Sequence, residues 1–176
     1  MSNCNFIHVP HDSYWTRDYG PWFVADGNRS ISIMDFTYNR PRYNDNAINS
    51  EMSVFLGTGL YEMDLVHCGG NYMCDGYSNA VSTDLVWEEN SNKTHAQIDV
   101  IVNDYLGIGT YHVTADPLDD YIKHVDCWGK YLYVDKILIG RVPSNDPRYS
   151  DYEAVANYFA AQTTGFNNTY QVFRVD

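Results

Sequence analysis

Two short segments of the chain carry side chains that could transfer protons. In His124-Val125-Asp126 a histidine stands two residues from a carboxylate. If this segment is extended, residues i and i+2 share one face of the strand, so both side chains would reach the same cleft. Asp18, within the aromatic segment Trp15–Trp22, offers a second carboxylate. A histidine with converging carboxylates suits acid–base chemistry on a cationic substrate.

Each of these side chains also has an ordinary structural explanation. His124 and Asp126 would form a satisfied pair at the end of a strand. Asp18, which precedes the sequence Tyr-Gly-Pro, would cap a turn. Cys127 follows directly and must be weighed as a nucleophile. On a strand its side chain would point away from the face that His124 and Asp126 share, so we do not favour it.

Two further clusters could bind a ligand. Arg40 and Arg42 flank a proline, which places two guanidinium groups on one stiffened loop. They could clamp a carboxylate, or they could be two solvated loop arginines. The segment Gly69-Gly70-Asn71 lacks the GxGxxG pattern and the lysine of phosphate-binding loops. A backbone that approaches a ligand closely, with Asp75 as hydrogen-bond acceptor, fits this segment better.

Composition and charge limit the class of protein. A length of 176 residues fits one domain with one core, and 44% hydrophobic with 15% aromatic residues argues against disorder. The formal charge of −12 disfavours nucleic-acid partners and favours cationic ligands, unless it serves solubility alone. No apolar run approaches the ~20 residues of a membrane span. The four cysteines, at 4, 68, 74 and 127, lack metal-binding spacing such as CxxC.

Apolar periodicity predicts the elements that must position these side chains. The predicted helices cover 46–57, 93–106 and 149–161. The predicted strands cover 6–9, 21–25, 31–36, 62–67, 71–74, 79–86, 110–114, 130–134, 136–142 and 170–175, and a polar loop covers 37–46. Helix starts recur about every 50 residues, which indicates a modular ring or stack of ββαβ-like units. The predicted fold class is therefore α+β.

Three motifs resemble, in order, those of the guanidine-modifying, or pentein, superfamily. They are Trp15-x-Arg17-Asp18-x-Gly20-Pro21-x-Phe23, Gly69-Gly70-Asn71 with Asp75-Gly76, and His124-Val125-Asp126, which match the agmatine deiminase pattern. The longer strings from Gly69 to Tyr77, from His124 to Tyr131 and from Arg148 to Glu153 look closer to the bacterial peptidylarginine deiminases of Porphyromonas type. The similarity runs over essentially all 176 residues.

The resemblance implies an α/β-propeller of five ββαβ blades, of which about three would lie in this chain. It also implies deimination, in which a cysteine thiolate attacks the guanidinium carbon, ammonia leaves, and water hydrolyses the thiouronium intermediate. Asp18 and Asp126 would hold the guanidinium, and His124 would act as general acid and then base. The implied substrate-binding residues are Arg40 and Arg42, for a C-terminal carboxylate, and Trp15, Asp75, Tyr121 and Ile122, which would line the pocket.

By the same resemblance, the family's nucleophilic cysteine lies beyond residue 176, and none of the four cysteines stands in its motif. We therefore expect residues 1–176 to be a partial pentein catalytic domain without its C-terminal blades, inactive alone. The missing blades would come from a complementing C-terminal chain or from further sequence of the same chain, unless the gene is truncated. No cofactor, metal ion or calcium dependence is expected. Neither a nucleic acid nor a membrane is an expected partner.

Several functions remain open at this stage. Conversion of C-terminal peptidyl-arginine to citrulline is favoured, because agmatine has no carboxylate for Arg40 and Arg42 to bind. Agmatine deimination in putrescine biosynthesis and non-catalytic binding of arginine peptides are the alternatives. A bacterial peptidylarginine deiminase would be secreted or on the cell surface, and an agmatine deiminase would be cytoplasmic. No signal peptide precedes residues 6–9, so the protein would be cytoplasmic or trimmed.

Overall fold

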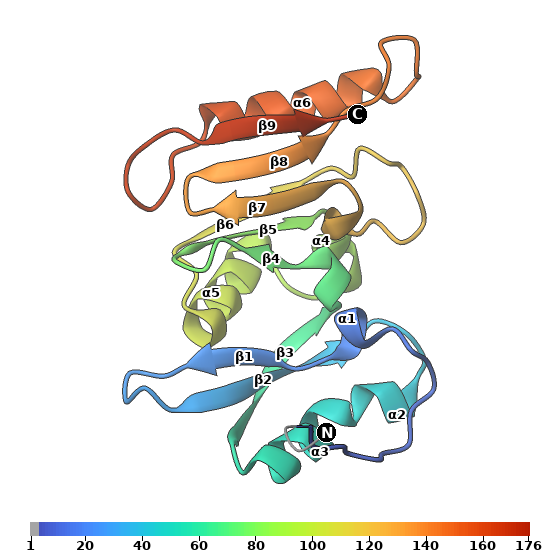
Figure 1. Cartoon of the computed structure of the whole chain (residues 1–176), viewed down its shortest axis with the longest axis vertical. Coiled ribbons are helices and arrows are strands. Elements are labelled where there is room, and N and C mark those ends of the chain that lie inside the picture. The colour runs from blue at the N-terminus through green and yellow to red at the C-terminus, as the bar shows by residue number, and fades with distance from the viewer. Residues whose placement is uncertain (1–3) are drawn as a thin grey trace. The chain divides into compact units, whose positions relative to one another are not determined.

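The computed structural model describes residues 4–176, whose contacts define two compact units, Met1–Gly69 (unit 1) and Gly70–Asp176 (unit 2). Unit 1 contains one sheet and unit 2 contains two (Figure 1). Each sheet has three strands in chain order; the first two are antiparallel and the last two parallel. Helices connect the second strand of each sheet to the third. The predicted α+β class and its three ββαβ repeats are confirmed.

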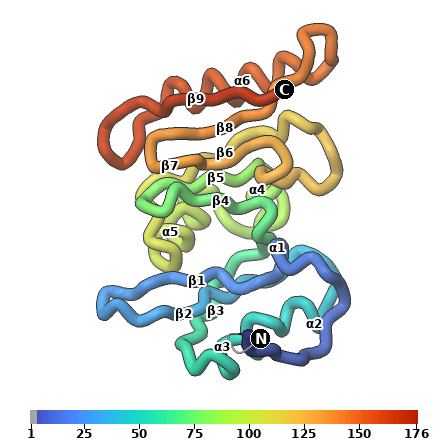
Figure 2. Tube along the Cα trace, viewed as in Figure 1, coloured from blue at the N-terminus to red at the C-terminus, as the bar shows by residue number. Residues whose placement is uncertain are grey.

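In unit 1 the central strand pairs with a local hairpin partner on one side and with a strand that returns from a helical crossover on the other. The tube in Figure 2 follows this path. The helix before the return strand ends at Gly57, which has the left-handed φ of 64° that glycine tolerates. The elements are α1 (Thr16–Tyr19), β1 (Trp22–Ala25), β2 (Ile31–Tyr38), α2 (Tyr43–Asn46), α3 (Ile48–Leu56) and β3 (Gly59–His67).

In unit 2 the same arrangement occurs twice. The longer helix of the first repeat begins at a capping box, in which Thr94 and Gln97 satisfy each other's backbone N–H groups. A one-turn helix, η1 (Gly69–Asn71), leads into the unit. The other elements are β4 (Met73–Cys74), β5 (Asn79–Thr83), α4 (Leu85–Glu89), α5 (His95–Leu106), β6 (Thr110–Thr114), η2 (Val125–Cys127), β7 (Gly129–Tyr133), β8 (Lys136–Gly140), α6 (Tyr149–Ala161) and β9 (Gln171–Val175).

The largest core lies in unit 2, where α6 contacts β8 and β9. Ile137, Ile139 and Phe159 are fully buried there. The alternation of buried and half-buried residues along β8 places Ile137 and Ile139 on the face that meets the helix. A smaller apolar cluster in unit 1 joins Tyr19 and Tyr38. No helix in the described part of the chain is long and apolar enough to span a bilayer.

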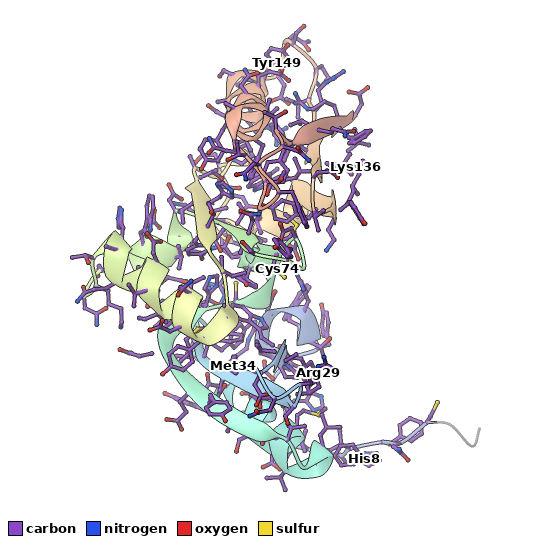
Figure 3. The ribbon with its side chains drawn as sticks, turned by 90° about the vertical axis from the view of Figure 1, so that its left-hand side faces the viewer. His8, Arg29, Met34, Cys74, Lys136 and Tyr149 are labelled. Carbon is purple, nitrogen blue, oxygen red and sulfur yellow. The ribbon has the colours of Figure 1, made fainter. Side chains whose placement is uncertain are left out.

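The predicted strand at 6–9 is wrong. Phe6 is 75% exposed, and Pro10 follows without a backbone N–H to continue a ladder. His8, labelled in Figure 3, lies in this irregular segment. The segment instead lines an open groove of about 750 Å³ beside α3. Three apolar residues among four were therefore not enough to form a strand, and residues 6–9 pair with no sheet.

Other boundaries also differ from the prediction: the helix at 46–57 is divided between α2 and α3, and the strand at 71–74 begins inside η1. The predicted loop 37–46 contains the end of β2 and helix α2. The predicted strand 79–86 stops at Thr83, and Val86 is fully buried as part of α4. Asp84 stands at the N-terminal cap of α4, a residue type common at helix starts, and the predicted strand ran through it.

Candidate active site

The predicted catalytic and binding side chains fall in both units, and each set is described within its own unit. Unit 1 carries Trp15, Asp18, Arg40 and Arg42. Unit 2 carries Asp75, Tyr121, Ile122, His124 and Asp126.

Asp18 lies on the single-turn helix α1, which is placed by close backbone packing. Gly69 approaches α1 so closely that a β-carbon on it would lie 2.0 Å from the carbonyl oxygen of Arg17. A β-carbon on Gly20 would lie 2.3 Å from the carbonyl oxygen of Thr16, which accepts the Gly20 N–H. Only glycine permits such approaches. The two motif glycines therefore fix the backbone that presents Asp18.

The Asp18 carboxylate is half-buried and acts electrostatically on Tyr38. Burial raises the pKa of the Tyr38 phenol, and the negative charge of Asp18 raises it further. The Arg42 guanidinium opposes this increase, because its Nη1 donates a hydrogen bond of 3.2 Å to the Tyr38 hydroxyl. The charges of Asp18 and Arg42 thus both act on the Tyr38 phenol, which lies near these two predicted site residues.

The two predicted clamp arginines differ in their surroundings. Arg42 Nη1 also lies 3.4 Å from Ser13 Oγ, and its charge contributes to the lowered pKa of Asp45. Burial would raise that pKa, but hydrogen bonds from Ser13 and the Asp12 backbone outweigh it. Within residues 4–176 the Arg40 side chain has no hydrogen bond or ion pair. Arg42 is therefore tied into the fold, whereas the Arg40 guanidinium is available to a ligand.

His124 is 7% exposed and precedes the one-turn 3₁₀ helix η2. Its own backbone is extended, but the N–H of Cys127 donates to its carbonyl oxygen, so the chain turns immediately after it. Val125 enters the core and Asp126 is exposed. The extended segment on which a shared strand face depended is not formed. One apolar residue between two polar ones fits a turn with a buried centre as well as it fits a strand.

Cys127 has the environment of a weakly reactive thiol. Partial burial, followed by the negative charges of Asp126, Asp120 and Asp116, raises its pKa to about 11. The Asp126 Oδ1 atom lies 3.8 Å from its Sγ. A thiolate nucleophile needs the opposite shift. The structure therefore disfavours Cys127 because of its partial burial and its acidic surroundings, and not because of the side-chain direction that a strand would give.

The loop before His124 is shaped by Asp120. Its Oδ1 accepts the backbone N–H groups of Ile122 and Lys123, both at 2.9 Å. Ile122 is half-buried, while Tyr121 is 88% exposed. In unit 1, Trp15 is 48% exposed. Within its own unit, neither aromatic side chain is enclosed.

Asp75 organises the turn between β4 and β5. Its Oδ1 accepts the backbone N–H groups of Tyr77, Ser78 and Asn79, and its Oδ2 accepts the Asn79 amide at 2.8 Å. Such a carboxylate replaces backbone acceptors in a tight turn. The bonds found for Asp75 are those of a turn residue, and its place in a ligand pocket stays a prediction.

Sequence reasoning missed the residues that hold the predicted ones. Asp45 is fully buried and accepts the backbone N–H groups of Asp12 and Ser13, more than thirty positions earlier. Tyr38 was predicted only as part of a loop. Asp45 acts across a long sequence separation, so no local pattern marks it, and the bond of Tyr38 to Arg42 spans four residues inside a stretch predicted to be a loop.

Each unit by itself carries a carboxylate that could bind a cation, Asp18 in unit 1 and Asp126 in unit 2, and unit 2 also carries the imidazole of His124. Carboxylates bind guanidinium N–H groups, and an imidazole can transfer a proton. Within either unit alone, the described His, Cys, Asp and Glu side chains form no group of three close enough to hold a metal ion.

Across residues 1–176 the chain matches the family profile described as Porphyromonas-type peptidyl-arginine deiminase. It is similar to an agmatine deiminase of Pseudomonas putida, with 25% identity over 165 residues that cover 84% of this chain and 45% of the relative. Among solved structures it is similar to a putative arginine deiminase from Porphyromonas gingivalis, with a TM-score of 0.84 and 19% identity over 96% of this chain and 55% of that one.

The agmatine deiminase of Enterococcus faecalis is also similar, with a TM-score of 0.86 and 20% identity over 95% of this chain and 50% of that one. At these identities the structural likeness establishes the fold, and the predicted pentein fold is confirmed. The chain spans about half the length of the relatives that it matches.

Proposed function

The chain belongs to the Porphyromonas-type peptidyl-arginine deiminase family, and we propose that it is part of an enzyme that converts C-terminal peptidyl-arginine to citrulline and ammonia. The observation that carries this proposal is the family match over residues 1–176. Its support from the residues is the presence of Asp18, His124 and Asp126 in their motifs. The proposed domain is incomplete, and its C-terminal blades belong to polypeptide outside these residues.

We assign the reaction steps as follows. Asp18 and Asp126 each accept hydrogen bonds from N–H groups of the planar guanidinium, which orients its carbon. A cysteine thiolate outside residues 1–176 adds to that carbon. The C–N bond then breaks, and His124 gives its proton to the departing ammonia. Neutral His124 next takes a proton from water, which attacks the thiouronium carbon. The thiolate leaves, the hydroxyl proton of the adduct is released to solvent, and the ureido group of citrulline remains.

The need for an outside nucleophile follows from the four cysteines in this chain. Cys127 has its pKa raised to about 11 in an acidic environment, and Cys68 is buried. Cys4 and Cys74 are exposed but stand outside the family's nucleophile motif. A complementing C-terminal chain would supply the thiolate, and these residues alone would bind substrate without turning it over.

Arg40 supports the choice of a substrate with a free carboxylate. Its guanidinium is half-buried and unpaired within the described residues, so it can form a bidentate pair with a substrate carboxylate. Arg42 would act beside it while remaining bonded to Tyr38. Agmatine is the second candidate substrate, because the curated relatives at 22–30% identity are agmatine deiminases or putative ones.

Calorimetric binding to the purified chain separates these candidates, with its polypeptides identified by intact mass. We expect a peptide that ends in arginine to bind more tightly than the same peptide with an amidated terminus, and more tightly than agmatine. Tighter binding of agmatine would favour the second candidate. Equal binding of the two peptides would reject the carboxylate clamp. A parallel assay for citrulline and ammonia tests turnover, which we expect only when a second, cysteine-bearing polypeptide is present.

A further inference from the structure

Thr83, the last residue of β5, joins two of the sequence motifs inside unit 2. It is fully buried. Its backbone N–H donates a 2.9 Å hydrogen bond to Oδ1 of Asn71, which belongs to the Gly69–Asn71 motif. The Thr83 Oγ1 atom lies 3.0 Å from the same Oδ1 and 2.6 Å from the carbonyl oxygen of Lys123. The shorter contact identifies the Lys123 carbonyl as the main acceptor of the hydroxyl proton.

Lys123, the residue directly before His124, has an unusual backbone conformation. Its N–H group, its carbonyl oxygen and its side-chain ammonium all have partners. Its φ is 48°, in the left-handed region that non-glycine residues rarely adopt. The N–H donates to Asp120, and the side-chain ammonium pairs with Glu88 and, at 3.6 Å, with Asp84. A strained backbone persists where neighbouring groups over-determine it, and such positions cluster at functional sites.

The Lys123 carbonyl and the His124 nitrogen belong to one planar peptide group. A hydrogen bond that fixes this carbonyl therefore fixes the positions of the His124 nitrogen and α-carbon, from which the imidazole side chain extends. We propose that Thr83 is a positioning residue for His124. Thr83 itself does not touch substrate. The proposal rests on the proposed function in one respect, which is that the proposed function assigns proton transfer to His124.

Threonine at position 83 is better explained by the positioning of His124 than by a role in packing alone. A strand end that needed only apolar packing would accept valine, which has the same shape as threonine but no hydroxyl. The backbone N–H of Thr83 already satisfies the Asn71 oxygen, so the hydroxyl is not required to pair that amide. Its remaining short contact is the Lys123 carbonyl.

The test compares three variants of the 176-residue chain by NMR of the histidine ring Cε1–Hε1 groups. Thr83→Val removes the hydroxyl at nearly constant shape, and Thr83→Ser restores it. Ser82→Ala is the matched control, because Ser82 is the adjacent buried residue and its Oγ accepts a 2.7 Å hydrogen bond from the Tyr111 hydroxyl. The His124 signal is assigned as the peak lost in His124→Gln.

We expect Thr83→Val to shift the His124 peak by more than its linewidth. Thr83→Ser should return the peak to its wild-type position, and Ser82→Ala should leave it there. A Thr83→Val protein that is folded, with its His124 peak unmoved, would overturn the proposal. So would an equal displacement in Ser82→Ala.

If Thr83→Val does not fold, a measurement on the wild-type chain can still test the hydrogen bond from the Thr83 hydroxyl to the Lys123 carbonyl. The Thr83 hydroxyl proton should exchange slowly with water and show a nuclear Overhauser effect to the His124 α-proton, which lies on the same side of the peptide group as the Lys123 carbonyl oxygen. A hydroxyl proton that exchanges at the rate of an exposed threonine would reject the hydrogen bond. Neither readout depends on deimination, so failure of the proposed function would leave both results interpretable.

Discussion

Gly69 lies against the carbonyl of Arg17 at a distance that leaves no room for a β-carbon, which would stand 2.0 Å from that oxygen. This contact sets the helix turn that carries Asp18. A glycine from one sequence motif therefore places the carboxylate of another.

The substitution Gly69→Ala should destabilise unit 1, because the added methyl meets backbone atoms that cannot rotate away. We expect a loss of about 2–3 kcal/mol in the free energy of unfolding, measured by urea denaturation. Gly27→Ala is the control, since nothing lies within 4 Å of the β-carbon added there. If the two variants unfold at the same urea concentration, the close approach is not structurally important.

His112 should make unit 2 less stable in mild acid. Burial lowers its pKa from 6.5 to about 4, although the charge of Asp75 opposes the shift. Above pH 6.5 the folded and unfolded states are both neutral at this site, so it adds no pH dependence. Between pH 6.5 and pH 4 only the unfolded state binds the proton, and unfolding becomes easier by about 1.4 kcal/mol per pH unit.

Urea unfolding of the wild type and of His112→Asn between pH 7.5 and 4.5 checks this prediction. Asparagine can still bond the Tyr158 hydroxyl, which lies 2.9 Å from His112 Nδ1, but it does not titrate. The difference in stability between the two proteins should change as the pH falls below 6.5. Parallel profiles would contradict a buried, neutral His112.

The two predicted clamp arginines should respond differently to truncation. Arg42→Ala removes hydrogen bonds to Tyr38 and Ser13 and should cost about 1–2 kcal/mol of stability. Arg40→Ala breaks no bond within the described residues, so its stability should stay within about 0.5 kcal/mol of the wild type. Thermal unfolding measures both. Under the proposed function, Arg40→Ala should also weaken binding of a free C-terminal arginine more than of its amide, and equal weakening would count against the clamp.

Asp18→Asn and Asp126→Asn should each weaken guanidinium binding, because each removes the charge from a carboxylate that faces a cation. If the pairs are desolvated in the complex, the loss is roughly 2–5 kcal/mol. Calorimetry with an arginine-terminated peptide measures it. Asp104→Asn, at an exposed position on α5, is the charge-matched control and should bind as the wild type does. Unchanged affinity in either site variant would remove that residue from the proposed site.

Cys127 should be a slow thiol. With a pKa of about 11, only about one in a thousand of its side chains is ionised at pH 8. Alkylation by iodoacetamide at that pH, followed by peptide mass spectrometry, should label exposed Cys74 first. Faster labelling of Cys127 would show that the three neighbouring aspartates do not suppress its thiolate.

The regular elements could be predicted because their signals are local. The helix at 149–161 was placed at both ends from the spacing of Tyr152, Val155 and Phe159, and all three side chains are buried. The predicted strand at 6–9 was wrong because a short apolar cluster suggests a strand but does not show whether a sheet edge is free to pair with it.

The site was predicted as a set of residues but not as a structure. The turn after His124 depends on burying Val125, and a short polar–apolar–polar pattern does not reveal that choice. The contacts of Thr83 with Asn71 and Lys123 join residues 12 and 40 positions apart. Only the folded chain brings such partners together, so the sequence alone could not assign them.

Each ladder in this chain is built from one continuous stretch of polypeptide, at 22–67, 73–114 or 129–175. A cut in the segment 115–119, between the second and third stretches, would therefore sever no strand pair. If the chain were divided there, by a split gene or by a protease, each of the two polypeptides would still contain whole sheets. The sheets on the two sides of that segment share one buried core, which includes Val81 and Ile137, so two polypeptides divided there would have to associate to keep it.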